Sequence, residues 1–275
     1  MKEHNNDDYF KKQKPSILRS IGGLLTFTTI IPLNVYTTID EMAKMTWFWP
    51  VINAFVGLIG AIIAYLLMGI IHFDPLLVAC IVYGFLIMIN GFNHLDGLMD
   101  FGDGIMVHGT PEKKLNIMKD PMTGVGGIAT GFVVGTITIA ALSSILNFAN
   151  LNSIYGILMI AIGEMSAKVG LITCCISSKP SPEGIGKYFI KYINIANYIV
   201  GIIIALIIAI ILSWQFGAIL GIAGVLGGIF GGALCSLLAK KHLKIANGDV
   251  LGSSNELGRL FSLLFMITVF SIAVI

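Results

Sequence analysis

Three aspartates in the first half of the chain have the type and spacing of a metal site. Asp96, Asp100 and Asp103 are spaced i, i+4 and i+7. On an α-helix they lie within about 60° of one another, with Asn93 close to the same face. Carboxylates this close repel unless a cation neutralises them, and oxygen ligands suit Mg²⁺ or Mn²⁺, which also bind substrate phosphate. The pattern predicts a metal site for a phosphate-linked substrate, with His94 nearby as a hydrogen-bond donor or base.

A solvated acidic surface is the alternative interpretation of this segment. Gly97, Gly102 and Gly104 are interleaved with the aspartates, and glycine allows a bulky ligand to approach the backbone closely. The segment also starts where an apolar block ends. We therefore favour a binding site over a solvated face.

Further candidates lie in the polar segments between later apolar blocks. Lys119 could pair with a phosphate and Asp120 with a metal, and the glycine-rich segment 124–127 could present backbone N–H groups to an anion. Lys179 and Lys187 lie in a turn-rich segment and could also reach a phosphate. Each of these signals is weak by itself.

Two more pairs of ionisable residues have helical spacing. Asp249 and Glu256 are spaced i, i+7 before the last apolar block, which places them at the mouth of the final span. Glu164 and Lys168 are spaced i, i+4 inside an apolar block. Ionisable groups in lipid are costly unless they are paired or face a polar cavity. The spacing predicts either a structural ion pair between Glu164 and Lys168 or a polar cavity beside them.

The composition indicates the elements that must position these residues. The chain has 275 residues, of which 56% are hydrophobic and 12% charged, whereas soluble domains have about 25% charged residues. Apolar blocks of about 17–25 residues have the length of membrane-spanning helices. We predict an all-α polytopic membrane protein, with a short interfacial or re-entrant helix within 21–38 because Pro32 interrupts that block. The seven predicted spans are 47–71, 75–92, 124–147, 151–176, 195–213, 217–239 and 259–275.

The basic residues predict the orientation. Of the 17 Lys and Arg residues, all except Lys168 lie in 1–46 or in the segments 93–123, 177–194 and 240–259. By the positive-inside rule the N-terminus and these three segments are cytoplasmic, in a multi-pass protein of the cell membrane. We divide the chain into a cytoplasmic segment, 1–46, and a transmembrane catalytic domain, 47–275. The net charge of +2 does not favour nucleic acid as a partner.

The acidic stripe belongs to a longer series of motifs. Two early segments are Phe27–Pro32 and Phe48–Gly60, and four later motifs are HxDGLxDxxDG at 94–104, MKDxxxGxxG at 118–127, a "RPxGxG"-like loop at 179–186 and GDxxG with a following Glu at 248–256. In content and order these segments resemble the adenosylcobinamide-GDP ribazoletransferase, or cobalamin synthase, family. Two positions depart from the family's pattern, because Lys168 and Lys179 stand where the family commonly has Arg, and a bidentate phosphate contact is lost at each.

The resemblance implies a phosphotransferase that completes the cobalamin nucleotide loop. A ribose hydroxyl of α-ribazole, or of its 5′-phosphate, attacks the cobinamide-linked phosphate of adenosylcobinamide-GDP and expels GMP, with Mg²⁺ as the cofactor. The lipid bilayer is a further partner, and a homo-oligomer is possible. The roles that we expect are metal ligation by Asp96, Asp100 and Asp103, catalysis by His94, Asp120, Asp249 and Glu256, and substrate binding by Asn93, Lys119, Lys179 and Lys187.

Two other functions fit parts of the pattern. A CDP-alcohol phosphatidyltransferase-like enzyme also uses clustered aspartates with Mg²⁺ at a membrane boundary, but its Ala-Arg after the first Asp-Gly is missing here. A cation-coupled transporter would place polar residues deep in several spans, whereas only Glu164 and Lys168, with scattered Ser, Thr and Asn, are found within the predicted spans.

Overall fold

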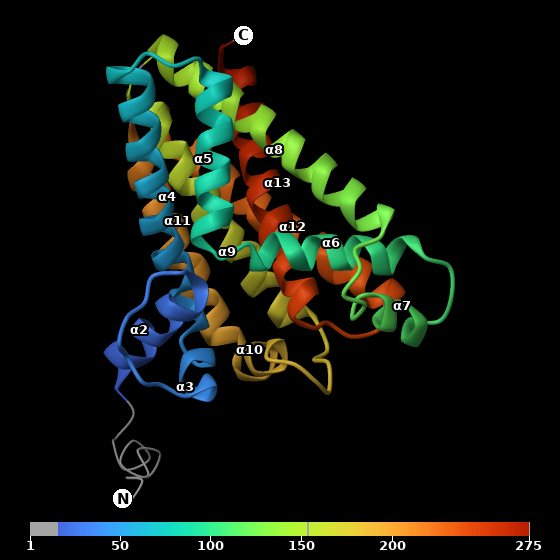
Figure 1. Ribbon diagram of the computed structural model, residues 1–275. Coiled ribbons are helices and arrows are strands. Elements are labelled where there is room, and N and C mark those ends of the chain that lie inside the picture. The colour runs from blue at the N-terminus through green and yellow to red at the C-terminus, as the bar shows by residue number, and fades with distance from the viewer. Residues whose placement is uncertain (1–15, 153, 275) are drawn as a thin grey trace, which may run out of the picture.

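A computed structural model of the chain describes residues 16–152 and 154–274. The described residues form helices joined by short connections (Figure 1), which confirms the predicted all-α class. In chain order the elements are α2 (Ile17–Thr28), α3 (Ile39–Ala43), η1 (Thr46–Phe48), α4 (Trp49–Tyr65), η2 (Leu66–Ile70), α5 (Pro75–Ile89), α6 (Asn93–Met106), α7 (Pro111–Ile117), α8 (Val125–Asn152), η3 (Ile154–Leu158), α9 (Met159–Ser177), α10 (Gly186–Tyr192), α11 (Ile195–Leu212), η4 (Trp214–Phe216), α12 (Ala218–His242) and α13 (Gly248–Val274).

Most of the long helices have the length and composition of membrane spans, so the chain is a polytopic membrane protein. Six of the described helices meet both conditions, and α5 with α6 gives a seventh crossing if this bent pair is taken as one span. The six are Thr46–Ile70, Val125–Phe148, Gly156–Ser177, Ile195–Leu212, Ala218–His242 and Gly248–Ile272. The predicted span 151–176 matches the third of them, although its residue 153 lies outside the described residues.

The N-terminal apolar segment is short, as predicted. α2 has 12 residues and ends before Pro32, so it lacks the length needed to cross a bilayer. The backbone N–H of Ile30 donates to the carbonyl of Ile89 at 2.8 Å, which fixes the segment after α2 against the end of α5. Residues 1–15 of the predicted segment 1–46 lie outside the described residues, and the division at residue 46 stays a prediction.

The acidic segment forms a helix that is turned sharply away from α5. The bend between α5 and α6 is 91°, and Figure 1 shows α6 running across the bundle. Gly91 and Phe92 both have positive φ, 64° and 59°, and such left-handed residues reverse the direction of the chain. Asn90 stabilises the end of α5, because its side-chain amide donates to the carbonyl of Leu86 at 2.8 Å.

α6 packs tightly against the start of α13. A Cβ atom at Gly97 would lie 2.8 Å from the Cα of Asp249, and one at Gly252 would lie 3.2 Å from the Cα of His94. α6 therefore needs glycine at position 97, and a side chain at position 252 would require a shift of a few tenths of an ångström. This contact brings the first and last polar motifs of the chain together.

The last helix begins earlier than the sequence predicts. We expected the final span to start at residue 259, whereas α13 begins at Gly248. Asn247 caps it, because its side-chain oxygen accepts from the backbone N–H of Val250 at 3.1 Å. Its polar first turns are accommodated because they pack against α6 and α9 and not against lipid. Arg259, which we counted as a cytoplasmic loop residue, is consequently buried inside the bundle.

The centre of the bundle is α9. It packs against α4, α12 and α13, and 94% of its most apolar stretch is buried inside the protein. Figure 1 shows α2, α3, α7 and α10 at the end of the bundle opposite the C-terminus, and α8 running diagonally toward α6 and α7. The polar connections around α6, α10 and α13 therefore gather at one end of the molecule.

Candidate functional site

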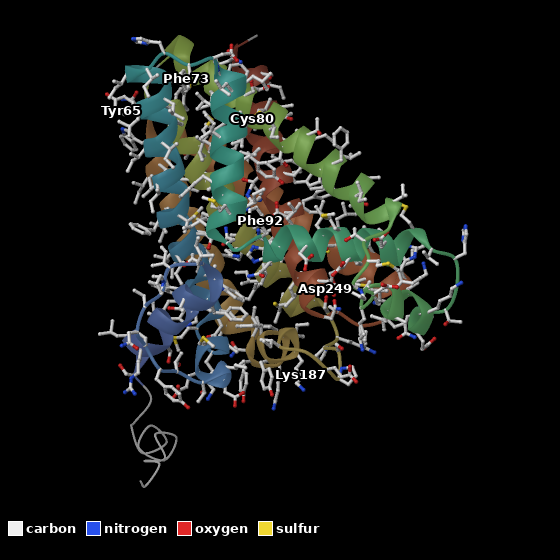
Figure 2. All side chains as sticks on the ribbon, in the orientation of Figure 1. Tyr65, Phe73, Cys80, Phe92, Lys187 and Asp249 are labelled. Atoms are coloured by element: carbon white, nitrogen blue, oxygen red, sulfur yellow. The ribbon has the colours of Figure 1, made fainter. Side chains whose placement is uncertain are left out.

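A cavity of about 570 Å³ lies where α6, α9 and α13 meet the connection between α9 and α10. The cavity has a polar wall and a largely aromatic and aliphatic wall. Figure 2 shows Asp249 beside α6 and Lys187 nearer the end of the molecule that carries α10. The lining residues are Phe27, Thr28, Trp49, Asn93, His94, Asp96, Lys119, Lys168, Leu171, Ser181, Glu183, Gly184, Ile185, Gly186, Phe189, Asn247, Gly248, Asp249, Leu251 and Gly252.

The polar wall contains two aspartates from helices that are remote in sequence. Asp96 lies in the first turn of α6 and Asp249 in the first turn of α13. Asn247 donates to a carboxylate oxygen of Asp249 at 2.7 Å. Burial, together with the negative charges of Asp249, Asp96 and Asp103, raises the pKa of the Asp100 carboxyl. The structure thus brings four carboxylates of the two motifs close enough to repel one another.

The third aspartate of the stripe has a different partner. Asp103 is nearly buried and accepts hydrogen bonds from the backbone N–H groups of Gly124 at 2.6 Å and Gly127 at 2.8 Å. A carboxylate in this position stabilises the start of α8, where backbone N–H groups lack helical acceptors. The glycine-rich segment 124–127 therefore does bind an anion, but the anion is a side chain of the protein itself. This differs from the expectation that Asp103 would be a metal ligand.

Binding of a metal ion in this cavity depends on the carboxylates other than Asp103. Among the described residues, no group of three or more His, Cys, Asp and Glu side chains is arranged to hold an ion. Mg²⁺ commonly uses one or two carboxylates together with water and substrate phosphate. Asp96 and Asp249 on the cavity wall, with Asp100 beside them, fit that smaller donor set.

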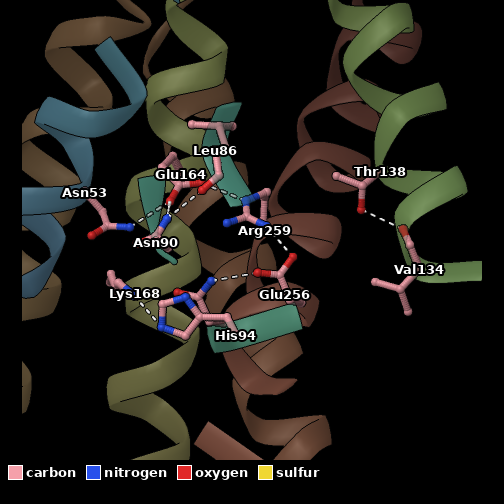
Figure 3. A network of polar contacts seen from close by, with 11 residues as sticks. Asn53, Leu86, Asn90, His94, Val134, Thr138, Glu164, Lys168, Glu256 and Arg259 are labelled. Carbon is pink, nitrogen blue, oxygen red and sulfur yellow. Dashed lines mark hydrogen bonds and ion pairs between the residues drawn. The ribbon is translucent and has the colours of Figure 1, made fainter. Parts of the chain in front are cut away.

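Lys168 and His94 meet at the polar wall. The ammonium nitrogen of Lys168 lies 3.0 Å from Nε2 of His94 (Figure 3), and it also lies 5.8 Å from the centre of the Trp49 ring. Lys168 is buried, yet it lines the cavity. The sequence singled out Lys168 as an ionisable residue in a span, and the resemblance placed it where the family commonly has Arg.

Of the two predicted alternatives for Glu164 and Lys168, the structure has the polar cavity, which Lys168 lines, and Glu164 pairs with another cation. Its carboxylate accepts from Nε of Arg259 at 2.7 Å and from the side-chain amides of Asn53 at 2.7 Å and Asn90 at 3.3 Å. Arg259 also forms an ion pair with Glu256, and all of these groups are buried (Figure 3). The expected catalytic residue Glu256 thus belongs to a buried ion network, and it does not line the cavity.

The other predicted residues lie at the mouth of the cavity or outside it. Lys119 lines the cavity and forms an exposed ion pair with Glu183 at 2.9 Å, which lowers the pKa of the Glu183 carboxyl. Asp120 is exposed and accepts from the backbone N–H of Met122. Lys187 is not a lining residue, and it donates to the carbonyl of Pro182 at 3.1 Å.

Lys179 lies in a second cavity. This cavity has a volume of about 250 Å³ and is also lined by Lys240 and Lys244. The backbone between the two cavities is fixed, because Ala246 donates to the carbonyl of Lys179 at 2.8 Å and Ser181 donates to the carbonyl of Ala246 at 2.9 Å. Segment 179–186 therefore separates Lys179 from the main cavity.

The family described as cobalamin-5-phosphate synthase matches residues 20–267. This chain belongs to that family. Its members in the comparison include proteins named adenosylcobinamide-GDP ribazoletransferase, in agreement with the resemblance found in the motifs.

The similarity covers nearly the whole chain. The relative from Methanosarcina mazei is 33% identical over 257 residues, which are 86% of this chain and 88% of the relative. The relative from Picrophilus torridus is 35% identical over 93% of this chain and 100% of its own length, and the one from Pyrococcus furiosus is 29% identical over 88% and 97%. No solved structure matches the chain.

The family motifs converge on the main cavity of this cobalamin-5-phosphate synthase family member. Each of the six segments that carry the resemblance contributes at least one lining residue. Phe27 and Trp49 come from the two early segments, and with Phe189 they form an aromatic wall in which ring centres lie 5.1 and 4.8 Å apart. The sequence did not assign this wall a role, although two of its three residues lie in motif segments.

Proposed function

We propose that this chain joins adenosylcobinamide-GDP to α-ribazole, or to α-ribazole 5′-phosphate, and releases GMP. The observation that carries the proposal is the convergence of all six family segments on one cavity that has carboxylates, an amine and an aromatic wall. Proteins named adenosylcobinamide-GDP ribazoletransferase are similar to this chain over most of their length. The activity is that of a transferase in cobalamin synthesis.

In the proposed reaction the ribose hydroxyl oxygen forms a bond to the phosphorus attached to cobinamide. The bond from that phosphorus to the bridging oxygen breaks, the oxygen leaves with GMP, and the hydroxyl proton passes to a base. Of the four residues expected to act as catalysts, His94 and Asp249 line the cavity, whereas Asp120 and Glu256 do not. The base is therefore to be sought on the wall formed by α6 and α13.

Mg²⁺ is part of the proposal. Asp96 and Asp249 would hold the ion, which would supply charge neutralisation on the diphosphate as the leaving group departs. Asp100 adds negative potential beside them. Lys119 at the mouth would help to attract the phosphates, since an exposed ammonium on a flexible stem can move between Glu183 and a ligand.

We further propose that the cavity faces the cytoplasm in the cell membrane. The last turn of α12 and the described polar connections that follow α6, α9 and α12 carry most of the described basic residues, and a segment near the inner membrane surface is expected to be basic. Soluble nucleotide substrates then reach the site without crossing the bilayer. The two substrates and the lipid bilayer are the proposed partners, and no oligomer is part of the proposal.

The decisive experiment is a reconstituted transfer assay. Purified protein in lipid nanodiscs receives adenosylcobinamide-GDP with α-ribazole, with α-ribazole 5′-phosphate or with neither, and GMP and the corrinoid product are measured. We expect GMP release that requires an acceptor and Mg²⁺ and that stops with EDTA. GMP release with no acceptor would indicate a hydrolase, and an inactive but well-folded protein would contradict the proposal. CDP-diacylglycerol with glycerol phosphate serves as the test of the phosphatidyltransferase alternative.

A further inference from the structure

The second cavity, apart from the main one, lies between the ends of two membrane-spanning helices. It has a volume of about 250 Å³, and it is lined by the end of α9, by the last turns of α12 and by the segment that follows α12. Three of its lining residues are lysines, and in the described part of the chain no carboxylate lines it. Ammonium groups that gather around one small cavity repel one another unless an anion neutralises them. The cavity is therefore suited to an anionic ligand.

The lysines of this cavity interact little with the protein itself. All three are exposed, and over the described ranges none of Lys179, Lys240 and Lys244 forms an ion pair. Their ammonium groups make one hydrogen bond to the described residues, a long one of 3.5 Å from Lys244 to the carbonyl of Lys241. The lysines are therefore available to a ligand.

The serine hydroxyls between α9 and α12 are used within the protein. Ser236 donates to the backbone carbonyl of Ser177 at 3.1 Å. Because a hydroxyl has a single proton, the 3.0 Å hydrogen bond between Ser178 and Ser236 must be donated by Ser178. These bonds join the end of α9 to α12 and give the cavity a fixed wall. Selection of an anion therefore depends on the lysines.

Lys244 stands at a position where glycine is the usual residue. It follows the end of α12 with a φ of 70°. Its backbone N–H and that of Leu243 both donate to the carbonyl of Ala239, at 2.9 and 2.7 Å, which closes the end of the helix. This left-handed conformation suits glycine and is unfavourable for residues that carry a Cβ atom. The turn itself gives no reason for a lysine, whereas the cavity does.

An exposed apolar stripe on α12 leads to the cavity. It consists of Leu226, Phe230 and Leu237, whose i, i+4 and i+11 spacing places them on one face of the helix. Lys240 comes three residues after Leu237, on the same side of α12. Since α12 has the length and composition of a membrane span, the stripe contacts acyl chains and the lysines at its end lie near the headgroups.

We propose that this cavity binds the phosphate of an anionic phospholipid, with Lys240 and Lys244 as the main contacts. The acyl chains lie along the apolar stripe of α12, and the headgroup phosphate enters the cavity at the membrane surface. Basic pockets between spans bind anionic headgroups by this combination of charge and position. The inference does not depend on the proposed function, because the segment 179–186 separates this cavity from the main one.

Lipid binding by the purified chain tests the proposal. Native mass spectrometry in detergent measures its affinities for phosphatidylglycerol and phosphatidylcholine with identical acyl chains. We expect the wild type to bind phosphatidylglycerol at least about 10-fold more tightly, and Lys240→Gln/Lys244→Gly to reduce this preference to about 3-fold or less. The single variant Lys244→Gly should keep or raise the unfolding temperature, because glycine suits the left-handed turn. Loss of lipid preference is then not a loss of folding.

A double variant with the same change in net charge is the control. Lys113→Gln/Lys241→Gln removes two exposed lysines that do not line the cavity, so it should keep the preference of the wild type. An equal loss in the two double variants would show a general attraction between charges and overturn the proposal. Equal affinities of the wild type for the two lipids would also overturn it.

Soluble competitors distinguish a lipid from other sources of phosphate. We expect neither inorganic phosphate nor GDP with Mg²⁺, each in large excess, to displace phosphatidylglycerol, because neither has acyl chains for the apolar stripe. Displacement by inorganic phosphate would indicate a site for the free ion in place of a lipid. Displacement by GDP would assign the cavity to the substrate and contradict its separation from the main cavity.

Discussion

The hydroxyl of Ser253 donates to the backbone carbonyl of Gly97 at 3.0 Å, across 156 residues of sequence. This bond joins α6 to α13 at the crossing where the acidic stripe meets the last motif. The carbonyl oxygen of Asp249 lies 2.8 Å from the same hydroxyl, whose single proton the two carbonyls share. The crossing therefore determines the separation of Asp96 and Asp249, on which the proposed metal site depends.

Enlarging Gly97 should disrupt the site through this crossing. A Cβ atom there would lie 2.8 and 2.9 Å from the Cα and carbonyl oxygen of Asp249, and backbone atoms cannot move aside as a flexible side chain does. We expect Gly97→Ala to lower kcat/KM by at least about 10-fold and to raise the Mg²⁺ concentration for half-maximal rate. Gly84→Ala is the matched control, because nothing lies within 4 Å of a Cβ atom at Gly84. Equal behaviour of the two variants would argue against a site built on the crossing.

The two kinds of aspartate should respond differently to substitution. Asp96→Ala and Asp249→Asn remove groups on the cavity wall, so they should abolish Mg²⁺-dependent turnover while the unfolding temperature stays within a few degrees. Asp103→Ala should instead destabilise the fold, because each of its two hydrogen bonds to backbone N–H groups is worth about 1.5–3 kcal/mol. Thermal unfolding and Mg²⁺ titration of the three variants separate the roles. A stable Asp103→Ala protein that has lost Mg²⁺ dependence would restore Asp103 as a ligand.

Arg259 should be essential for stability. Its replacement by Met leaves Glu164 and Glu256 as buried carboxylates without their cation, and breaking a buried pair in this way costs about 3–5 kcal/mol. We expect a lower unfolding temperature and poor membrane yield for Arg259→Met. The triple replacement with Glu164→Gln and Glu256→Gln should recover part of the loss, since it removes the unpaired charges. Lys241→Met, at an exposed position, is the control.

The exposed pair between Lys119 and Glu183 should affect substrate binding and not stability. The lowered pKa of Glu183 keeps its carboxylate charged at neutral pH, and the pair is lost only as the pH falls through that lowered pKa. If Glu183 competes with the substrate phosphate for Lys119, Glu183→Gln lowers KM for adenosylcobinamide-GDP by about 2–5-fold at pH 7. Lys119→Gln should raise this KM. Equal KM values in both variants and the wild type would place Lys119 outside the binding path.

The orientation can be tested by labelling. Glu112→Cys introduces a thiol at an exposed position in α7, on the end of the bundle that carries the main cavity. A membrane-impermeant maleimide should label it in inverted vesicles and leave it unlabelled in intact cells, because the positive-inside rule places this segment in the cytoplasm. Labelling in intact cells would reverse the orientation of the protein and of its site. A Cys introduced at the exposed Phe73, at the opposite end, should give the opposite result.

The sequence alone determined the features that depend on local composition. Apolar length predicted the spans, since about 20 apolar residues are needed to cross a bilayer. The shared face of the three aspartates presupposed a helix, which α6 forms. Pro32 predicted that the first apolar helix would be too short to span. The motif series predicted the family, and the roles expected for Asp96 and Asp249 agree with their place in one cavity.

Only the tertiary structure decided which partner each ionisable group has. A spacing of i, i+4 makes a pair of Glu164 and Lys168 feasible, but Arg259 packs closer to Glu164, and Lys168 is left with His94. Asp103 lies on the predicted stripe, yet backbone N–H groups at the start of α8 donate hydrogen bonds to both of its carboxylate oxygens. Hydrogen bonds and ion pairs act over a few ångströms. They are therefore set by how helices distant in sequence pack, and helical periodicity within one segment cannot predict that packing.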